Sequence, residues 1–350
     1  MNKNYARADI QAIAGYVPGE QLSGTVIKLN TNENPYPPSP RVGEAARAFD
    51  WESLRLYPDP TALPLRECAS RIYGLPRECI LCGNGSDDLL TIALRTFVAA
   101  GEGFAYPEPS YSLYPVLAQL QGARRHPIAL DGDFQLPDDV LRQAGEARLL
   151  MLARPNAPTG NSFPKEAIRR LCREFPGVVW IDEAYADFAE DNCLDLVGEF
   201  PNVVVSRTFS KSYSLAGLRL GLAFGDAALI AEMNKLKDSY NTDRFAQAMG
   251  VAALEDQEYL ERSVARVKET RRRTAQALER QGATVLPSQT NFLLVHPARR
   301  PARDLFLALR QEGFLVRHFS LPRVEEFLRV SIGTEEQMEL FLEAMGRLDR

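Results

Sequence analysis

The chain has 350 residues, of which 45% are hydrophobic and 25% charged, so it has a globular composition and the length of about two domains. Its 41 Lys and Arg against 46 Asp and Glu give a net charge of −5, and no basic block marks a surface for nucleic acid or anionic membrane. The N-terminal residues lack a signal-peptide core and no run of about 18 apolar residues occurs, so we expect a cytoplasmic protein with small-molecule partners.

Five scattered cysteines are typical of reduced thiols rather than of a disulfide framework. Cys79 and Cys82 have the CxxC spacing of metal and redox sites, but they lie in an apolar run whose strand pleat would send them to opposite faces. Only three histidines are present. We therefore expect no metal site.

Short aliphatic runs, each followed by a Gly, Pro, Asn or Ser turn and a helical pattern, recur between about residues 75 and 235. The first run is CILC (79–82), with a turn at 83–87 and a helix from Asp88. Three further strand-and-turn segments follow: ARLLMLARPNAPTG (147–160), GVVWIDEAYADF (177–188) and NVVVSRTFSK (202–211). This order predicts βαβ units around a mostly parallel sheet.

The C-terminal part has a different pattern. Residues 245–280 predict one or two long amphipathic helices, and 289–297 and 325–334 alternate like antiparallel strands, with helices at 302–312 and after 334. We predict a large α/β domain over residues 50–240. A smaller α+β domain with an N-terminal arm would comprise residues 1–49 and 241–350.

Polar residues follow the predicted strands, and ligands of open parallel sheets bind beyond the carboxyl ends of the strands. These residues are Gly85, Ser86, Asp87, Asn156, Asp182, Tyr185, Thr208, Ser210, Lys211 and Arg219. We expect them to meet at one edge of the sheet and to form the site.

Two of these groups have an ordinary structural explanation beside a functional one. Ser86 and Asp87 at a helix start offer N–H groups to an anion such as phosphate, yet both residue types are also common N-caps. The segment lacks the GxGxxG pattern of a dinucleotide site. Asp182 at the end of a buried strand requires a cationic partner, unless it is a satisfied capping residue.

Lys211 is the most informative residue of the pattern, although most lysines are solvated surface charges. An amine near a second cation, or in an apolar pocket, loses its proton more easily and becomes a Schiff-base nucleophile. Arg219 and the hydroxyls of Thr208 and Ser210 suit a phosphate. A lysine for a carbonyl, a cup for a phosphate and an aspartate for a protonated ring nitrogen together predict pyridoxal 5′-phosphate as cofactor.

The motifs around these residues resemble those of the fold-type I pyridoxal phosphate aminotransferases: SK (210–211), LRLG (218–221), DEAY (182–185) and PTG (158–160). Further segments narrow the resemblance to the histidinol-phosphate aminotransferase family over nearly the whole chain: LNTNENPYPPSP (29–40), RLYPDP (55–60), GNGSDD (83–88), PEPSYSLY (107–114) and FLRVSIGT (327–334). The resemblance implies an aspartate aminotransferase-like fold with a seven-stranded sheet, and a homodimer.

The resemblance also implies roles for individual residues. Lys211 would hold the cofactor through a Schiff base and move the proton between the substrate Cα and the cofactor C4′. Asp182 would pair with the ring nitrogen, Tyr185 would hydrogen-bond the phenolic oxygen, and Tyr111 would stack on the ring. The phosphate cup would comprise Gly85, Ser86, Asp87, Thr208, Ser210 and Arg219, joined by Tyr57 of the partner subunit.

The substrate's anionic group calls for a guanidinium, which grips such a group in two places. Arg329 falls on the strand face opposite Leu328 and Val330, and an arginine in solvent at a sheet edge is the alternative. The resemblance implies that Arg317 and Arg329 face this anion and that Tyr16 contacts the substrate phosphate.

Three positions depart from the family pattern. Alanine stands at 157, where the family has an asparagine that hydrogen-bonds the ring oxygen, so either Asn156 substitutes or Tyr185 works alone. Gly15 replaces a proline, and YNTD (240–243) replaces Tyr-Asn-x-Asn.

The expected activity is transamination between L-histidinol phosphate and 2-oxoglutarate, giving imidazole acetol phosphate and glutamate in histidine biosynthesis. An aromatic amino acid aminotransferase and a threonine-phosphate decarboxylase are alternatives on the same scaffold, the second distinguished by CO₂ release. A scaffold protein without cofactor would leave Lys211, Asp182 and Arg219 unexplained.

Overall fold

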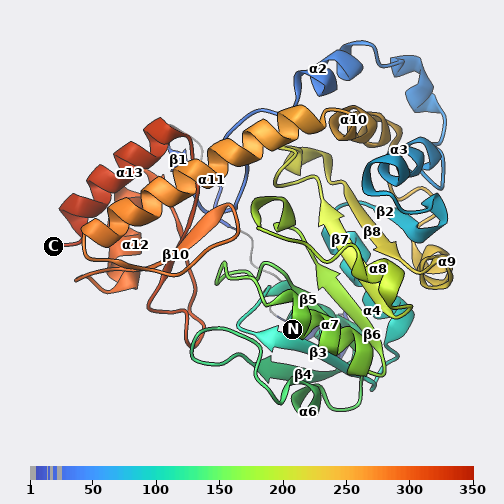
Figure 1. Ribbon diagram of the computed structural model, residues 1–350, viewed down its shortest axis with the longest axis horizontal. Coiled ribbons are helices and arrows are strands. Elements are labelled where there is room, and N and C mark those ends of the chain that lie inside the picture. Colours follow the sequence, from blue (N-terminus) through green and yellow to red (C-terminus); the bar gives the residue numbers. More distant parts are fainter. Residues whose placement is uncertain (1–4, 14, 16–18, 22–25) are drawn as a thin grey trace.

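The computed structural model describes residues 5–13, 15, 19–21 and 26–350. Figure 1 shows two sheets, a large one covered by helices and a smaller one beside it, with the long helix α11 (Gln257–Arg280) running across the top of both. The predicted α/β architecture with a large, mostly parallel sheet and a smaller α+β part is confirmed.

The large sheet has seven strands, and only β8 runs antiparallel to its neighbours. Their order across the sheet is β2 (Ile80–Gly83), β8 (Gly221–Gly225), β7 (Val203–Thr208), β6 (Val178–Asp182), β5 (Ala147–Ala153), β3 (Gly103–Glu108) and β4 (Arg124–Ala129). The central strands are continuous aliphatic runs because both faces of the sheet are covered.

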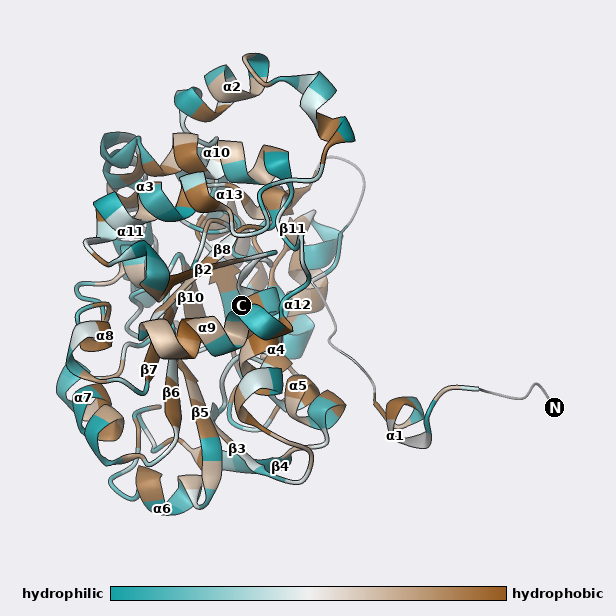
Figure 2. Ribbon diagram, turned by 90° about the vertical axis from the view of Figure 1, so that its right-hand side faces the viewer, coloured by the Kyte–Doolittle hydropathy of each residue, from teal (hydrophilic) through white to brown (hydrophobic). Residues whose placement is uncertain are grey.

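The two faces carry different helices. On one face, side chains such as Trp180 and Val204 pack under α4 (Ser86–Phe97), α5 (Leu113–Gln121) and α9 (Ala227–Leu236). On the other face, the alternate residues such as Ile181 and Val205 belong to the main core. The helices that contribute to this core beside the sheet are α3 (Leu63–Tyr73), α6 (Val140–Ala144), α7 (Lys165–Glu174), α8 (Leu196–Glu199) and α10 (Arg244–Leu254). Figure 2 shows the hydrophobic strands enclosed by these layers.

The smaller sheet is antiparallel, in the order β12 (Arg317–His318), β13 (Leu328–Ser331), β10 (Phe292–His296) and β9 (Thr284–Val285). α11, α12 (Ala302–Gln311) and α13 (Glu335–Leu348) accompany it. β1 (Ile27–Lys28) pairs in parallel with β11 (Phe314–Leu315), which ties the N-terminal segment to this part of the protein. The short α1 (Ala8–Gln11) stands apart from both sheets (Figure 2).

Local signals explain where several helices begin. The segment 245–280 forms two helices because Asp256 lies between them and caps α11 by accepting a hydrogen bond from the Tyr259 N–H. Thr334 and Gln337 form a capping box at the start of α13. α10 packs against α2 (Pro40–Arg47) and α3. The domain boundaries at about residues 50 and 240 stay a prediction.

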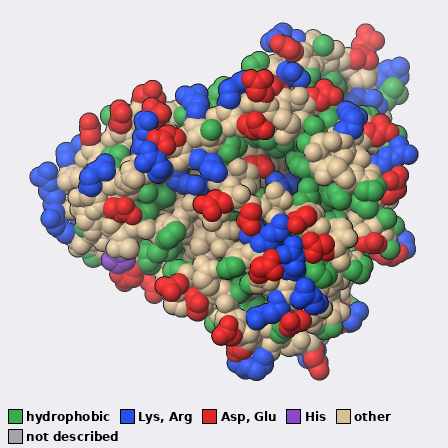
Figure 3. Space-filling view, viewed as in Figure 1, with side chains coloured by type: hydrophobic (Ala, Val, Ile, Leu, Met, Phe, Trp, Pro, Cys, Tyr) green, Lys and Arg blue, Asp and Glu red, His purple; other side chains and the backbone are tan. Residues whose placement is uncertain are grey.

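Among the described residues, the face shown in Figure 3 has no large area in which side chains of one charge gather. Acidic and basic side chains are interspersed on the face shown in Figure 3. In the described ranges, none of the helices combines the length and apolar character that crossing a membrane requires.

Candidate active site

A cavity of about 260 Å³ opens at the carboxyl ends of β5, β6 and β7, where Ala153, Asp182 and Thr208 line it. Its opposite wall comes from residues 30–33 and from Arg317 and Arg329 of the smaller sheet. Most of the polar residues predicted to meet at this edge of the sheet line the cavity: Ser86, Asp87, Asp182, Tyr185, Thr208, Ser210, Lys211 and Arg219.

Lys211 follows β7 and points its amine into this cavity. Its Nζ donates to the Thr31 carbonyl at 3.1 Å and lies 5.8 Å from the centre of the Tyr185 ring. Burial, with the positive charge of Arg329, lowers the pKa of Lys211 to about 8. A substantial fraction of this amine is therefore neutral near pH 8, which a nucleophilic amine requires.

Asp182 ends β6 with its carboxylate buried and has no ion-pair partner among the residues that the structure describes. Its oxygens accept from the Tyr114 hydroxyl at 3.3 Å, the Ser206 hydroxyl at 3.4 Å and the Ala184 N–H at 3.2 Å. Burial, with the charge of Asp87, raises the pKa of Asp182 to about 7. A cation placed against this carboxylate would relieve the cost of its ionisation.

A ring of donors at the start of α4 forms a cup for an anion. Gly85 has φ +85°, and a Cβ there would lie 2.6 Å from Arg219 Nη2, so only glycine lets the guanidinium approach the helix start. Arg219 Nη1 lies 3.4 Å from Ser210 Oγ, and Arg219 Nη2 lies 3.5 Å from Asp87 Oδ2. The N-terminus of α4 adds backbone N–H groups and a positive dipole end.

The two halves of the cup meet at Gly221. In the sheet register this residue pairs with Gly83 of β2 and with Thr208 of β7. A Cβ at 221 would lie 2.8 Å from the backbone carbonyl carbon of Gly85. The start of α4 and the Thr208–Ser210 segment therefore lie close together because the residue between them, Gly221, has no side chain.

Aromatic residues line the middle of the cavity. Tyr111 lines it and donates its hydroxyl to Asp87 Oδ1 at 3.0 Å. Tyr185 is buried with its hydroxyl accepting from Asn32 Nδ2 at 2.9 Å, and burial raises the pKa of its phenol. Ala157 also lines the cavity, and its side chain has no polar atom.

Two arginines of the smaller sheet also line the cavity. Arg317 of β12 and Arg329 of β13 are direct neighbours in the antiparallel register, and both line the cavity. The Arg329 guanidinium donates to the Asn30 carbonyl at 2.8 Å and lies 5.3 Å from the centre of the Phe319 ring. The two guanidinium groups bring positive charge to the cavity that also holds Lys211, and this charge suits an anionic ligand.

Three predicted residues of the described ranges do not line the cavity: Asn156, Tyr57 and Gly85, which directly precedes the lining residue Ser86. Asn156 is fully buried beside it, donating to the Pro109 carbonyl and to Thr159 while accepting from Ser110 Oγ. Tyr57 is 76% exposed and stacks on Tyr240, with ring centres 4.4 Å apart. Tyr16 lies outside the described residues.

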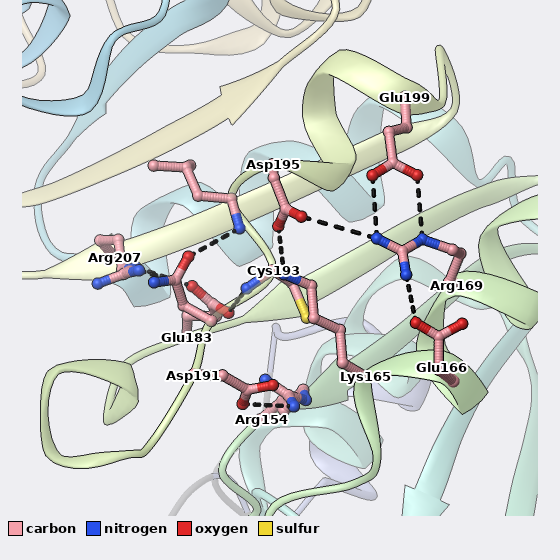
Figure 4. A network of polar contacts seen from close by, with 12 residues as sticks. Arg154, Lys165, Glu166, Arg169, Glu183, Asp191, Cys193, Asp195, Glu199 and Arg207 are labelled. Carbon is pink, nitrogen blue, oxygen red and sulfur yellow. Dashed lines mark hydrogen bonds and ion pairs between the residues drawn. The ribbon is translucent and has the colours of Figure 1, made fainter.

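A buried ion pair, seen in Figure 4 as part of a wider network of polar contacts, links the ends of β6 and β7. Arg207, the residue before Thr208, pairs with Glu183, the residue after Asp182, at 2.9 Å. Arg207 also contacts Asp187 at 2.7 Å, and Asp187 accepts from the hydroxyl of Ser212. The ends of β6 and β7 are thereby held together next to Lys211.

Sequence reasoning missed Asn32 and Tyr114 as residues of the site. Both lie in segments that carried the family resemblance, residues 29–40 and 107–114, but neither was given a role. Thr31 and Glu33, which belong to the first of these segments, also line the cavity. The signal that could have identified these residues was the presence of polar side chains in two motifs, 29–40 and 107–114, of which few residues had been given a role.

Comparisons with known proteins agree over the full chain. Residues 24–345 match the family model of aminotransferase class I and II. Histidinol-phosphate aminotransferase from Syntrophotalea carbinolica is 46% identical over 98% of this chain and 99% of the relative, and that from Synechocystis is 44% identical over 98% and 97%.

Solved structures give the same relation. The histidinol-phosphate aminotransferase from Sinorhizobium meliloti, in complex with pyridoxal 5′-phosphate, superimposes with a TM-score of 0.91 at 26% identity, covering 99% of this chain and 98% of that one. A Thermus thermophilus aspartate aminotransferase, at 19% identity and a TM-score of 0.82, has the same fold.

Proposed function

The chain belongs to the histidinol-phosphate aminotransferase family within aminotransferase class I and II, and from this we propose that it transfers the amino group of L-histidinol phosphate to 2-oxoglutarate. The products would be imidazole acetol phosphate and glutamate, within histidine biosynthesis. The observation that carries the proposal is one cavity lined by Lys211, Asp182 and the Arg219 cup together with the two arginines of the smaller sheet.

Pyridoxal 5′-phosphate is the cofactor that fits this cavity. The buried Asp182 suits a protonated ring nitrogen, the glycine-lined cup suits a phosphate, and the amine of lowered pKa suits an aldehyde carbon. When bound, this group withdraws electrons from the substrate and so makes the Cα proton removable.

The residues of the chain would bind and orient the cofactor. Asp182 would hold the ring-nitrogen proton, Tyr185 would donate to the phenolic oxygen and Tyr111 would lie against the ring. The phosphate would be held by Ser86, Thr208, Ser210 and Arg219 together with the N–H groups that follow Gly85, while Asp87 positions Arg219 and Tyr111. Asn156, whose amide is occupied by Pro109, Ser110 and Thr159, stays a predicted contact.

Lys211 would provide the acid–base chemistry. An amine with a pKa of about 8 can accept a proton from the substrate Cα and return it to the cofactor C4′ near neutral pH, because both of its protonation states are populated there. Its hydrogen bond to the Thr31 carbonyl and the wall formed by Tyr185 restrict where the amine can move.

Arg317 and Arg329 would bind the anionic group of each substrate in turn, the phosphate of histidinol phosphate and a carboxylate of 2-oxoglutarate. Tyr16 remains a predicted phosphate contact. The two arginines belong to β12 and β13 of the smaller sheet, whereas Arg219 lies between β7 and β8 of the large sheet, so the substrate anion and the cofactor phosphate would be bound by different parts of the protein.

We also propose a homodimer in which Tyr57 of the partner subunit completes the phosphate cup. The support is a set of exposed apolar side chains around this tyrosine: Trp51, Leu54, Leu56 and Tyr240. Tyr57 itself does not line the cavity of its own chain and is largely exposed, which leaves its ring available to the cup of another subunit.

A half-reaction tests the substrate. The protein loaded with pyridoxal 5′-phosphate is mixed with histidinol phosphate, phenylalanine or threonine phosphate without keto acid, and the change of its visible absorbance and the release of CO₂ are followed. Rapid conversion by histidinol phosphate alone is expected. Equal or faster conversion by phenylalanine would assign the protein to the aromatic aminotransferases, and CO₂ from threonine phosphate would make it a decarboxylase. Lys211→Ala, which should lack the visible band, is the control.

A further inference from the structure

Asn32 uses every polar group it has in a buried contact. Its side-chain Nδ2 donates to the Tyr185 hydroxyl at 2.9 Å, and its Oδ1 accepts from Ser331 Oγ at 2.8 Å. Its backbone N–H donates to the same Ser331 oxygen at 2.8 Å, and its carbonyl accepts from Asn291 Nδ2 at 2.9 Å. Ser331 belongs to β13 and Asn291 immediately precedes β10, so the smaller sheet fixes this residue.

The backbone of Asn32 is also unusual. Its φ is +56°, a left-handed conformation that residues other than glycine adopt rarely and that asparagine tolerates better than most. Such a conformation persists where the surroundings impose it, and it is found preferentially at functional sites. The bonds from Ser331 and Asn291 impose it here, and they direct the amide toward the cavity wall.

This contact decides where the hydrogen of the Tyr185 hydroxyl points. A phenol has one hydrogen, and an oxygen that already accepts a bond from Asn32 must direct that hydrogen elsewhere. Accepting a bond also makes the hydroxyl a stronger donor. Tyr185 lines the cavity, and Ala157 supplies no donor at the position where the family pattern has an asparagine.

We propose that Asn32 is a positioning residue, which orients the Tyr185 hydroxyl as the donor to the phenolic oxygen of the cofactor and so compensates for the donor that Ala157 lacks. The inference rests on the proposed function, because it requires pyridoxal 5′-phosphate in the cavity. Through Asn32, the segment 29–40 would thus influence the hydrogen bond that Tyr185 donates to the cofactor.

The visible absorbance of the bound cofactor, titrated against pH without substrate, tests this role. A donor to the phenolic oxygen competes with the proton that this oxygen shares with the Lys211 nitrogen, so a weaker donor raises the titration midpoint. Asn32→Gly keeps the positive φ and removes the amide; the midpoint should rise by about half to one pH unit. Asn32→Asp keeps the shape but accepts the tyrosine hydrogen, so its midpoint should rise at least as far as that of Tyr185→Phe.

Two controls separate positioning from general stability. Asn202 donates to the Cys172, Phe175 and Gly177 carbonyls away from the cavity, so Asn202→Ala should lower the melting temperature and leave the midpoint unchanged. In a double-mutant cycle, Asn32→Gly should add nothing to Tyr185→Phe, because both remove one interaction.

An unchanged midpoint in Asn32→Gly, or shifts that add fully with Tyr185→Phe, would overturn the inference. A wild-type protein that binds no cofactor would overturn the proposed function and this inference with it. A wild-type protein that has the visible band but ignores histidinol phosphate would overturn only the substrate assignment, since the titration contains no substrate.

Discussion

Asp182 and Lys211 have pKa values that move toward each other for one physical reason. Each is a charge held in a cavity with little water, so burial raises the pKa of the acid to about 7 and lowers that of the amine to about 8. Neither residue has an ion-pair partner in the described part of the chain. The cavity is therefore electrostatically prepared for a ligand with a cation at one point and a carbonyl at another.

The Asp182 carboxylate should cost the cofactor-free protein stability. Its pKa is about 7 in the folded state against an ordinary value of 3.8 for an aspartate, so between these values the folded protein holds a proton that the unfolded chain has lost. The free energy of unfolding should therefore fall as the pH rises through this window, and the full penalty should be present above pH 7.

Asp182→Asn should remove this penalty. In the cofactor-free protein at about pH 8 the variant should gain up to about 4 kcal/mol over wild type, a gain that shrinks toward about pH 4. It should also bind the cofactor more weakly, because an amide does not hold the ring-nitrogen proton. Denaturant unfolding of both proteins across this pH range measures the difference. Parallel stability curves would contradict the assigned pKa.

The start of α4 shows how an element acquires a binding role from its backbone. Helical periodicity predicts the helix, and Ser86 and Asp87 are ordinary residues for its first turn. What makes it a cup is Gly85, because its left-handed φ and missing side chain admit Arg219. The predicted start at Asp88 was two residues late, since the structure begins the helix directly after this glycine.

Gly85→Ala should weaken cofactor binding by displacing Arg219. The added methyl would lie 2.6 Å from Arg219 Nη2, so the dissociation constant should rise about 10- to 100-fold. Gly74, the C-cap of α3, is a matched control, because it has φ +72° and no atom near its absent Cβ. Gly74→Ala should lose about 1 kcal/mol of stability from the same backbone strain and keep its cofactor affinity. Equal affinities in the two variants would refute the role of Gly85.

The parts of the fold that could be predicted from the sequence are those that depend on a local pattern of hydrophobic and turn residues. Aliphatic runs identified β5, β6 and β7, and the residues after them, such as Lys211, were recognised as the site because parallel strands end at one edge. Asn32 was not recognised because its partners Tyr185 and Ser331 lie 153 and 299 residues away in the sequence. Hydrophobic periodicity reports only on residues that are close in sequence. The direction of the Asn156 side chain could not be predicted either, because it depends on the path of the loop that follows β5.

Mixing inactive variants tests whether Tyr57 acts across a dimer. Lys211→Ala and Tyr57→Ala homodimers should each be impaired, while a heterodimer has one site with both residues intact if Tyr57 comes from the partner. After subunit exchange, about a quarter of the wild-type activity should return, since half of the dimers are mixed and each has one intact site. A tyrosine acting within its own chain would give no recovery. Light scattering after size exclusion establishes the dimer itself.

The position of β8 has a consequence for the synthesis of the protein. The segment containing Lys211 and Arg219 connects β7 to β8, its hydrogen-bonded neighbour, and β8 ends at Gly225. Every residue of the cup lies before that point, whereas Arg317 and Arg329 come about a hundred residues later. A chain emerging from the ribosome thus has its own residues of the cofactor cup well before those of the substrate end. We expect these residues to assemble first, and Tyr57 of the partner subunit to join them only when two chains meet.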